Sequence, residues 1–220
     1  MENYQLLVTK ILDTYKRKNL QDSLICLPVF GSDDSVIAFL RPITSDYIIT
    51  TPNCVELMSK WRIENPTISN GIFTVTHERT KKWLDSLVIN NDKRIIFLVE
   101  DFSGRYIGHI GFAAFDYEKK TAEIDSVLRG VKGVLPGLME HCMKAMIRWG
   151  YDVLKLEKIE LSVFSDNTHA VEFYRRCGFA DDVLTPMRKV EMPDEVKWEP
   201  DPDTTRKDAE KYYLKLKYIG

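Results

Sequence analysis

The stretch NTHAVEFYRRCGF, from Asn167 to Phe179, contains a short amphipathic helix with its own start and stop signals. Asn167 stands where a helix N-cap belongs, because its side-chain oxygen can accept a hydrogen bond from the first turn. Gly178 is placed to end the helix. One face of the predicted helix carries Ala170, Phe173, Tyr174 and Cys177.

The segments before this helix predict a strand, a long helix and a second strand. Residues 122–128 form the first strand, and a helix begins at about Pro136. One face of that helix is apolar, with Leu138, Cys142, Ala145, Trp149 and Val153 at spacings of three or four. Residues 159–163 alternate between apolar and polar side chains, which is typical of a strand. The order favours a parallel crossover unit, because parallel strands need a long connection.

Two further strands precede this unit. Residues 94–100 contain a continuous apolar run, and a turn signal, Asp-Phe-Ser-Gly, follows at 101–104. Residues 106–115 supply the partner strand of a hairpin. A second turn at 118–120 leads into the strand at 122–128. We therefore expect a meander of antiparallel strands.

The N-terminal part of the chain predicts helices around one strand. Residues 2–20 have apolar residues at helical spacing, and residues 35–42 read as a strand. A second helix follows Pro52, and Thr76 can cap a third.

The C-terminal part is less regular. Residues 181–208 are rich in proline and charge and show no period, so we expect a loop excursion there. Residues 211–218 read as a closing strand. We accordingly divide the chain into an N-terminal helical extension, residues 1–34, and one α/β domain, residues 35–220.

Composition excludes several classes of protein. The chain has 31 basic and 33 acidic residues, a net charge of −2, so it has no global basic field for nucleic acid. No apolar run reaches the roughly 18–20 residues of a membrane span. The four cysteines are scattered and form no metal-binding pattern with histidine. We expect a cytoplasmic protein without a nucleic-acid, membrane or metal partner.

The loop RGVKGVLPG, residues 129–137, connects a strand to a helix and could bind an anion. Arg129 and Lys132 supply positive charge, while Gly133 and Gly137 let the backbone approach a ligand. Free N–H groups and the helix dipole favour negative charge at a helix start. The alternative is an ordinary loop in which Pro136 begins the helix.

Asn167 and Tyr174 are seven residues apart, so two helical turns bring them to similar faces. They could line one site. Asn167 could equally be only a cap, and Tyr174 only a core aromatic with its hydroxyl at the rim.

Taken together, these elements resemble the GNAT family of acetyltransferases. The order of meander, loop, helix and parallel strand is similar, and the segment N-x-x-A-x-x-x-Y-x-x-x-G-F is present letter for letter at residues 167–179. The resemblance covers about residues 35–179, with 211–218 as a last strand. It implies a GNAT fold: an α/β (α+β) domain with a mixed, mostly antiparallel twisted sheet flanked by helices, here with an extra N-terminal helix. It also implies an N-acetyltransferase that uses acetyl-CoA.

The loop departs from the family pattern Q/R-x-x-G-x-G/A. Aligning the last glycine on Gly137 puts Lys132 at the basic position and Leu135 where glycine is expected. Pro136 lacks an N–H and removes one phosphate donor. The resemblance implies that Arg129, Lys132, Gly133 and Gly137 hold the pyrophosphate. It also implies that Asn167 binds the pantetheine arm.

The resemblance assigns catalysis to the same region. It implies that Tyr174 protonates the departing thiolate and that a backbone N–H within residues 124–127 polarises the thioester. Glu123 and Asp125 alternate onto one strand face and are the first and second candidates for the base. Alternatively, one of them pairs with Arg129 or orders the loop. His109 is a further candidate at the substrate site, or a structural histidine.

A second likeness concerns the acceptor. Trp61-Arg62 and Asn65, with the strands that follow, resemble acetyltransferases of nucleotide-linked amino sugars, which would place Arg62 at the substrate. The alternative is that Trp61 is core and Arg62 a surface charge. We expect a small-molecule amine acceptor, in particular a nucleotide-linked amino sugar. A protein amine and a non-catalytic acyl-CoA-binding module are the alternatives, and a homodimer is open.

Overall fold

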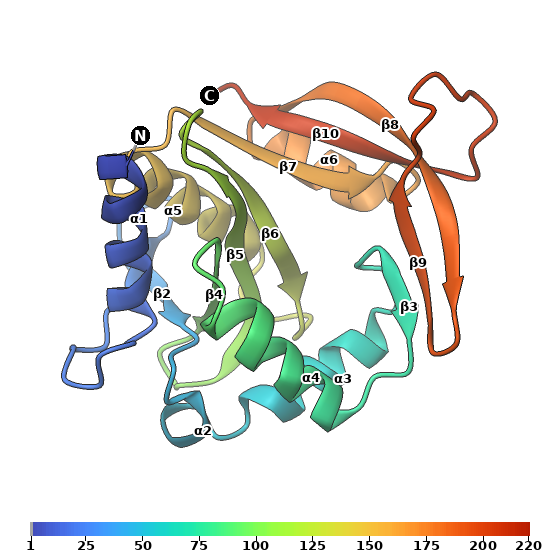
Figure 1. The fold of residues 1–220 in the computed structure, drawn as a ribbon. Helices are drawn as coiled ribbons and strands as arrows, with labels where there is room; N and C mark the ends of the chain where they lie inside the picture. The colour runs from blue at the N-terminus through green and yellow to red at the C-terminus, as the bar shows by residue number, and fades with distance from the viewer. Residues whose placement is uncertain (1) are drawn as a thin grey trace.

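The computed structural model describes residues 2–220 as a mixed α/β fold around one ten-stranded sheet (Figure 1). The strand order is β1-β2-β4-β5-β6-β7-β10-β8-β9-β3, and neighbouring strands are antiparallel except for β6 and β7. The strands are β1 (Leu27–Phe30), β2 (Val36–Pro42), β3 (Gly71–Phe73), β4 (Arg94–Glu100), β5 (Tyr106–Asp116), β6 (Thr121–Arg129), β7 (Lys158–Phe164), β8 (Phe179–Met192), β9 (Glu195–Pro200) and β10 (Lys211–Tyr218). The helices are α1 (Glu2–Tyr15), α2 (Tyr47–Thr50), α3 (Cys54–Glu64), α4 (His77–Trp83) with a π-helical continuation (Leu84–Ile89), α5 (Leu138–Asp152) and α6 (Thr168–Arg176). The expected mostly antiparallel sheet flanked by helices is confirmed.

The predicted meander and crossover unit are both present. β4, β5 and β6 run antiparallel in sequence order. Helix α5 then carries the chain to β7, which pairs in parallel with β6. Asn167 caps α6 as expected, since its Oδ1 accepts a hydrogen bond from the Ala170 N–H at 3.2 Å. Thr76 likewise caps α4.

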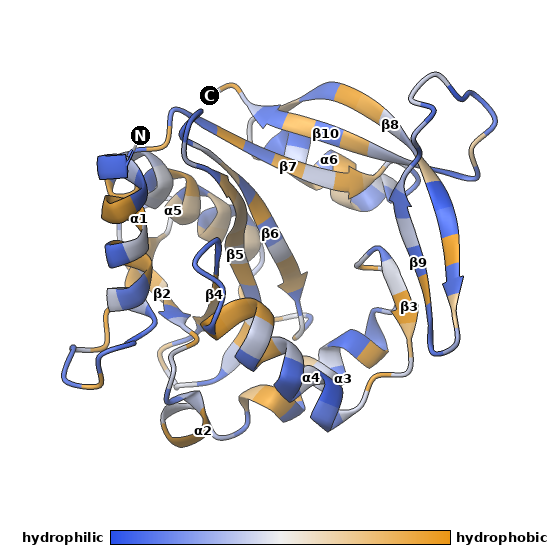
Figure 2. Cartoon of the chain, viewed as in Figure 1, coloured by the Kyte–Doolittle hydropathy of each residue, from blue (hydrophilic) through white to orange (hydrophobic). Residues whose placement is uncertain are grey.

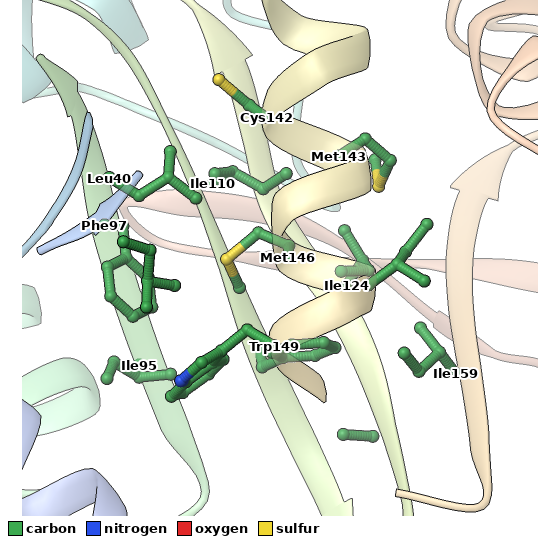
Figure 3. Close-up of a cluster of buried hydrophobic side chains, with 14 of the residues drawn as sticks. Leu40, Ile95, Phe97, Ile110, Ile124, Cys142, Met143, Met146, Trp149 and Ile159 are labelled. Carbon is green, nitrogen blue, oxygen red and sulfur yellow. The ribbon is translucent and has the colours of Figure 1, made fainter. Parts of the chain in front are cut away.

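One face of the sheet, here called the α5 face, packs against α1 and α5. Figure 3 shows Met143, Met146 and Trp149 of α5 projecting onto the strands, where they meet Phe97 and Ile124 among others. The helix has one apolar stripe with the period of a helix, and that stripe is what the sheet buries.

The opposite face, the α3 face, is covered by α2, α3, α4 and the π-helical continuation. Trp61 of α3 and Leu84 meet Ile96, Leu98 and Leu128 in a second core. β4 is buried on both faces, which explains its continuous apolar run.

The N-terminal segment differs from the helical extension that the sequence predicts for residues 1–34. The first helix ends at Tyr15 rather than at residue 20. Residues 27–30 form an edge strand, β1, which pairs with β2. Such a short strand, with Pro28 inside it, gives almost no periodic signal.

The predicted loop excursion at 181–208 is wrong over most of its length. β8 and β9 form a long hairpin, and only residues 201–210 lack regular structure. Few positions of the two strands are fully buried, so they carry charges instead of alternating apolar residues. Cross-strand pairs such as Arg188–Glu199, 3.5 Å apart, accompany the backbone ladder. Figure 2 shows the mainly hydrophilic colour of β9.

Through the hairpin, the last strands of the sheet contact the segment that contains α3, β3 and α4. β3 lies between these helices in the chain and pairs with β9. Arg79 of α4 forms an ion pair with Glu195 of β9 at 2.5 Å, and the Trp198 N–H donates to the Asn70 carbonyl at 2.7 Å. The sheet therefore curves until its last strand meets the helices that cover its own face (Figure 1).

Two features are absent from residues 2–220. No helix there is long and apolar enough to cross a membrane. Within the same residues, no group of three or more His, Cys, Asp or Glu side chains could hold a metal ion.

Lys16, just after α1, is a completely buried lysine. Its Nζ donates to the Asn91 carbonyl at 2.5 Å. Burial lowers the pKa of Lys16 from 10.5 to about 8, aided by Lys18 and opposed by Asp13 and Asp92. Between these two pKa values the unfolded chain binds a proton that the folded chain has released. The unfolding free energy therefore rises with pH in this range.

We expect Lys16→Met to remove this pH dependence. The variant should be more stable relative to the natural protein at pH 7 than at pH 9.5, with the difference shrinking by about 2 kcal/mol. Urea unfolding at the two pH values measures it, and Lys10→Met, an exposed position on α1, is the control. If the difference in unfolding free energy between the two proteins does not change with pH, the charge of buried Lys16 does not destabilise the fold at pH 7.

Candidate active site

Strands β6 and β7 separate part of the way along their length. Their parallel pairing covers only three positions and ends at Glu123↔Glu160, although β6 continues to Arg129 and β7 to Phe164. Figure 1 shows the two strands diverging beyond this junction. The backbone of residues 124–127 therefore lacks a strand partner on the β7 side, and its N–H groups can donate to a ligand placed between the strands.

A bulge in β6 shapes the same segment. Ser126 has a positive φ of 53°, and the pairing of β5 with β6 shifts between His109 and Gly111. A bulge adds one residue and reverses the alternation. As a result Val127 packs on the α5 face together with Ile124.

His109 lies behind the bulge rather than in the opening. Its side chain is 6 % exposed, and its ring is 5.9 Å from that of Trp61. Nδ1 lies 2.6 Å from the Ser126 carbonyl, and burial lowers the pKa of His109. A neutral imidazole that donates to this carbonyl stabilises the bulge, so the structural alternative is the better description of His109.

The two candidate bases lie on the α3 face, each beside a cation. An Asp125 carboxylate oxygen is 3.2 Å from Arg94 and accepts a hydrogen bond from the Ser126 hydroxyl at 3.1 Å. Glu123 is 3.4 Å from the Nζ of Lys215. The alternative that one of these carboxylates pairs with Arg129 is not what the structure contains.

Tyr174 projects from α6 and packs against Phe173 and Phe179, with ring centroids 5.4 and 6.3 Å away. Burial, and secondly the charge of Asp125, raise the pKa of Tyr174. The phenol is therefore protonated throughout the physiological range. It can act as a hydrogen-bond or proton donor.

Arg129 stabilises the conformation of the loop that follows β6. Its guanidinium donates to the carbonyls of Val131, at 3.1 Å, and Val134. Leu135, at the position where the family has glycine, has a positive φ of 46°. These bonds help to hold a conformation that is unfavourable for leucine.

The rest of the loop is open. Lys132 is exposed, and a Cβ added at Gly133 or Gly137 would meet nothing within 4 Å. Gly137 is the N-cap of α5 and offers no side chain to the first turn. The N–H groups of that turn and the Lys132 ammonium can thus face an anion, which fits a diphosphate.

Gly130 is required for packing. A Cβ there would lie 2.0 Å from the Trp61 ring, so the indole of α3 rests directly on the start of the loop. Trp61 is 1 % exposed and belongs to the core, as one interpretation of the sequence has it.

Arg62 is more than a surface charge. It donates to the Ser69 hydroxyl at 2.6 Å and to the Gly71 carbonyl at 2.5 Å, and its guanidinium lies 5.2 Å from the Phe73 ring centroid. These contacts fasten the loop between α3 and β3. Its place at a substrate stays a prediction.

Three residues that the sequence analysis did not single out complete the opening. Lys215 lies between Glu123 and Glu160, 3.2 Å from the latter. Burial and the charges of Asp125 and Glu123 raise the pKa of Tyr213 to about 12. Arg94 is the third. Alternation along β4 and β10 would have assigned each a face, but only the sheet order shows which carboxylates they meet.

Residues 38–180 match the family described as the acetyltransferase (GNAT) domain. The chain therefore belongs to the GNAT acetyltransferases, a class of acyltransferase enzymes, and the resemblance seen in the sequence is confirmed. Enzymes of this family use acetyl-CoA as co-substrate. No curated protein sequence matches the chain.

Solved structures support the fold. A chimera of the spermidine N-acetyltransferase SpeG from Vibrio cholerae and hSSAT aligns with a TM-score of 0.58 and 15% identity, over 82% of this chain and 94% of its own. A probable acetyltransferase of the GNAT family from Chromobacterium violaceum aligns with a TM-score of 0.62 and 13% identity, over 88% and 86%. A dodecameric spermidine N-acetyltransferase from Vibrio cholerae gives a TM-score of 0.54 and 14% identity, over 75% and 87%. At these identities the likeness shows the fold alone.

We expect Gly130→Ala to be more damaging than Gly133→Ala. The first places a methyl group inside the Trp61 ring contact, which should cost about 3 kcal/mol, the upper end of what overpacking costs. The second meets open space and bears only the strain of its positive φ, about 1 kcal/mol. Chemical denaturation measures both. Equal losses would mean that the indole does not rest on the loop.

Proposed function

We propose that this enzyme transfers the acetyl group of acetyl-CoA to a primary amine of a small molecule. The observation that carries the proposal is the junction at which β6 leaves β7. It leaves the backbone of residues 124–127 without a partner on the β7 side, beside the carboxylates of Glu123 and Asp125, and in our proposal the Tyr174 phenol of α6 serves this opening.

The donor side follows from the loop and α6. Lys132 and the first turn of α5 would hold the diphosphate, with Arg129 shaping the loop from behind. The Asn167 side-chain oxygen is used in the cap, which leaves its amide N–H groups for the pantetheine arm.

The reaction needs one base, one acid and a polarised carbonyl. The amine nitrogen forms a bond to the acetyl carbon while the carbon–sulfur bond breaks. The amine proton goes to a carboxylate, directly or through water, and the Tyr174 proton goes to the departing thiolate. An N–H within residues 124–127 donates to the acetyl oxygen.

Asp125 is our preferred base, with Glu123 second, which reverses the order favoured by the sequence. Asp125 lies within the segment of β6 that has left β7, whereas Glu123 belongs to the last paired row, opposite Glu160. Glu123 is instead held by Lys215 next to Glu160.

The acceptor side favours a small molecule. The β8–β9 hairpin and β3 border the α3 face beside α3 and α4, so the sheet is concave on this side (Figure 1), which suits a small acceptor better than a folded protein. A nucleotide-linked amino sugar remains the specific acceptor suggested by the Trp61-Arg62 segment. The carboxylates and the phenol at the opening disfavour a module that only binds acyl-CoA.

A thiol-release assay with acetyl-CoA and a panel of amines tests the proposal. The panel should contain glucosamine, a nucleotide-linked amino sugar, spermidine and a lysine peptide. We expect turnover with at least one small amine and none with the peptide. Acetylation of the peptide alone, or of no amine, would overturn the proposal.

We expect Tyr174→Phe to lower kcat by at least about tenfold, because general acid catalysis contributes about 10²–10⁴ in rate. The ring packing is kept, so acetyl-CoA affinity should hold. Tyr213→Phe is the matched control, since it removes a second phenol near Asp125. A loss confined to Tyr213→Phe would transfer the acid role to Tyr213.

We expect Lys132→Ala to raise KM for acetyl-CoA with little change in kcat, because the ammonium would touch only the remote diphosphate. Steady-state kinetics with Lys144→Ala, an exposed lysine further along α5, provides the comparison. An unchanged KM would show that Lys132 does not reach the diphosphate.

A further inference from the structure

We propose that Arg94 forms a subsite for an oxyanion, a carboxylate or a phosphate, carried by the acceptor next to its amine. The inference rests on the proposed function, because it describes the substrate of the same opening.

The position of Arg94 places it beside the reacting groups. Arg94 is the first residue of β4 and pairs with Ala113 of β5, which in turn pairs with Glu123 of β6. In the next row Gly111 lies opposite Asp125. The β5 residues between Arg94 and the two carboxylates, Ala113 and Gly111, are thus small. The long side chain of Arg94 can cross them to reach Asp125.

The guanidinium has bonding capacity to spare. One Nη is 3.2 Å from Asp125, and the group lies 6.0 Å from the Trp83 ring centroid. Nε is shielded from solvent and has no hydrogen-bond partner among residues 2–220. A guanidinium carries five N–H donors, and donors left unpaired in a buried setting lower stability. An oxyanion at this place would accept some of them.

Arg41 shows that an unpaired Nε does not by itself mark a site. Its Nε is also buried without a partner, and it likewise pairs with one carboxylate, Glu100, at 3.5 Å. However, Arg41 lies on β2 opposite Leu98 and donates to the Thr50 carbonyl at 3.2 Å. Of these two arginines, Arg94 is the one whose ion-pair partner, Asp125, is also a candidate base.

The charges at the opening favour an acceptor that carries its own negative charge. Three carboxylates, those of Glu123, Asp125 and Glu160, are matched by three cations, Arg94, Lys215 and Lys158. An acceptor with only ammonium groups, such as a polyamine, would find no excess negative charge here. An acceptor with an oxyanion beside its amine keeps the balance, with the oxyanion at Arg94 and the amine at Asp125.

Pairs of amines that differ only in the anion test the proposal. One arm compares histidine with histamine, lysine with cadaverine and phenylalanine with phenethylamine. The other compares glucosamine 6-phosphate with glucosamine. For each pair, kcat/KM is measured for the natural enzyme and for Arg94→Met, Arg94→Lys and Arg41→Met.

We expect the natural enzyme to prefer the anionic member of at least one pair by about tenfold or more. Arg94→Met should abolish this preference: loss of the Asp125 counterion affects both members of a pair, and the anionic member alone loses its oxyanion partner as well. Arg94→Lys should retain part of the preference, and Arg41→Met all of it. The arm in which the preference appears identifies carboxylate or phosphate.

Three results would overturn the inference. The first is turnover of amines without an anionic group, polyamines included, at the same efficiency as their anionic counterparts. The second is a preference that survives both Arg94→Met and Arg94→Lys. The third is an equal loss on both members of a pair in folded variants, which would make Arg94 only a counterion that positions Asp125. Failure of every amine in both arms would overturn the proposed function itself.

Discussion

The end of the pairing between β6 and β7 at Glu123 is the constraint on which the site depends. The parallel ladder keeps the two strands together for three positions, and their divergence then exposes backbone donors between them. A strand interior offers no such donors, because each N–H is used by a neighbour. The opening therefore exists only because two paired strands separate inside a continuous sheet.

Several contacts hold the opening in place without entering it. The buried imidazole of His109 supports the bulge at Ser126, and the guanidinium of Arg129 supports the loop that follows. Trp61 presses on Gly130 where that loop begins. Both sheet faces are covered by helices, so this part of β6 cannot relax by moving outward. A rigid frame of this kind is what a site that orients a thioester requires.

The acceptor side is built differently, mainly from charges. Arg94, Lys215 and their carboxylate partners project from four strands onto the face that α3 and α4 share with the β8–β9 hairpin. These side chains are half-buried, so their ion pairs are screened by water less than fully exposed pairs would be. Substrate choice would then follow from charge balance more than from shape.

The sequence by itself determined the local elements. Caps at Thr76 and Asn167, the apolar stripe of α5 and the run in β4 fixed the meander and the crossover, because these signals act between residues close in the chain. The motif at 167–179 also sufficed to identify the family. The hairpin β8–β9, the short strand β1 and the partners of Glu123 and Asp125 were decided by tertiary structure alone. Edge strands are held by ladders to distant strands, and ion pairs across a sheet depend on strand order, which no local period encodes.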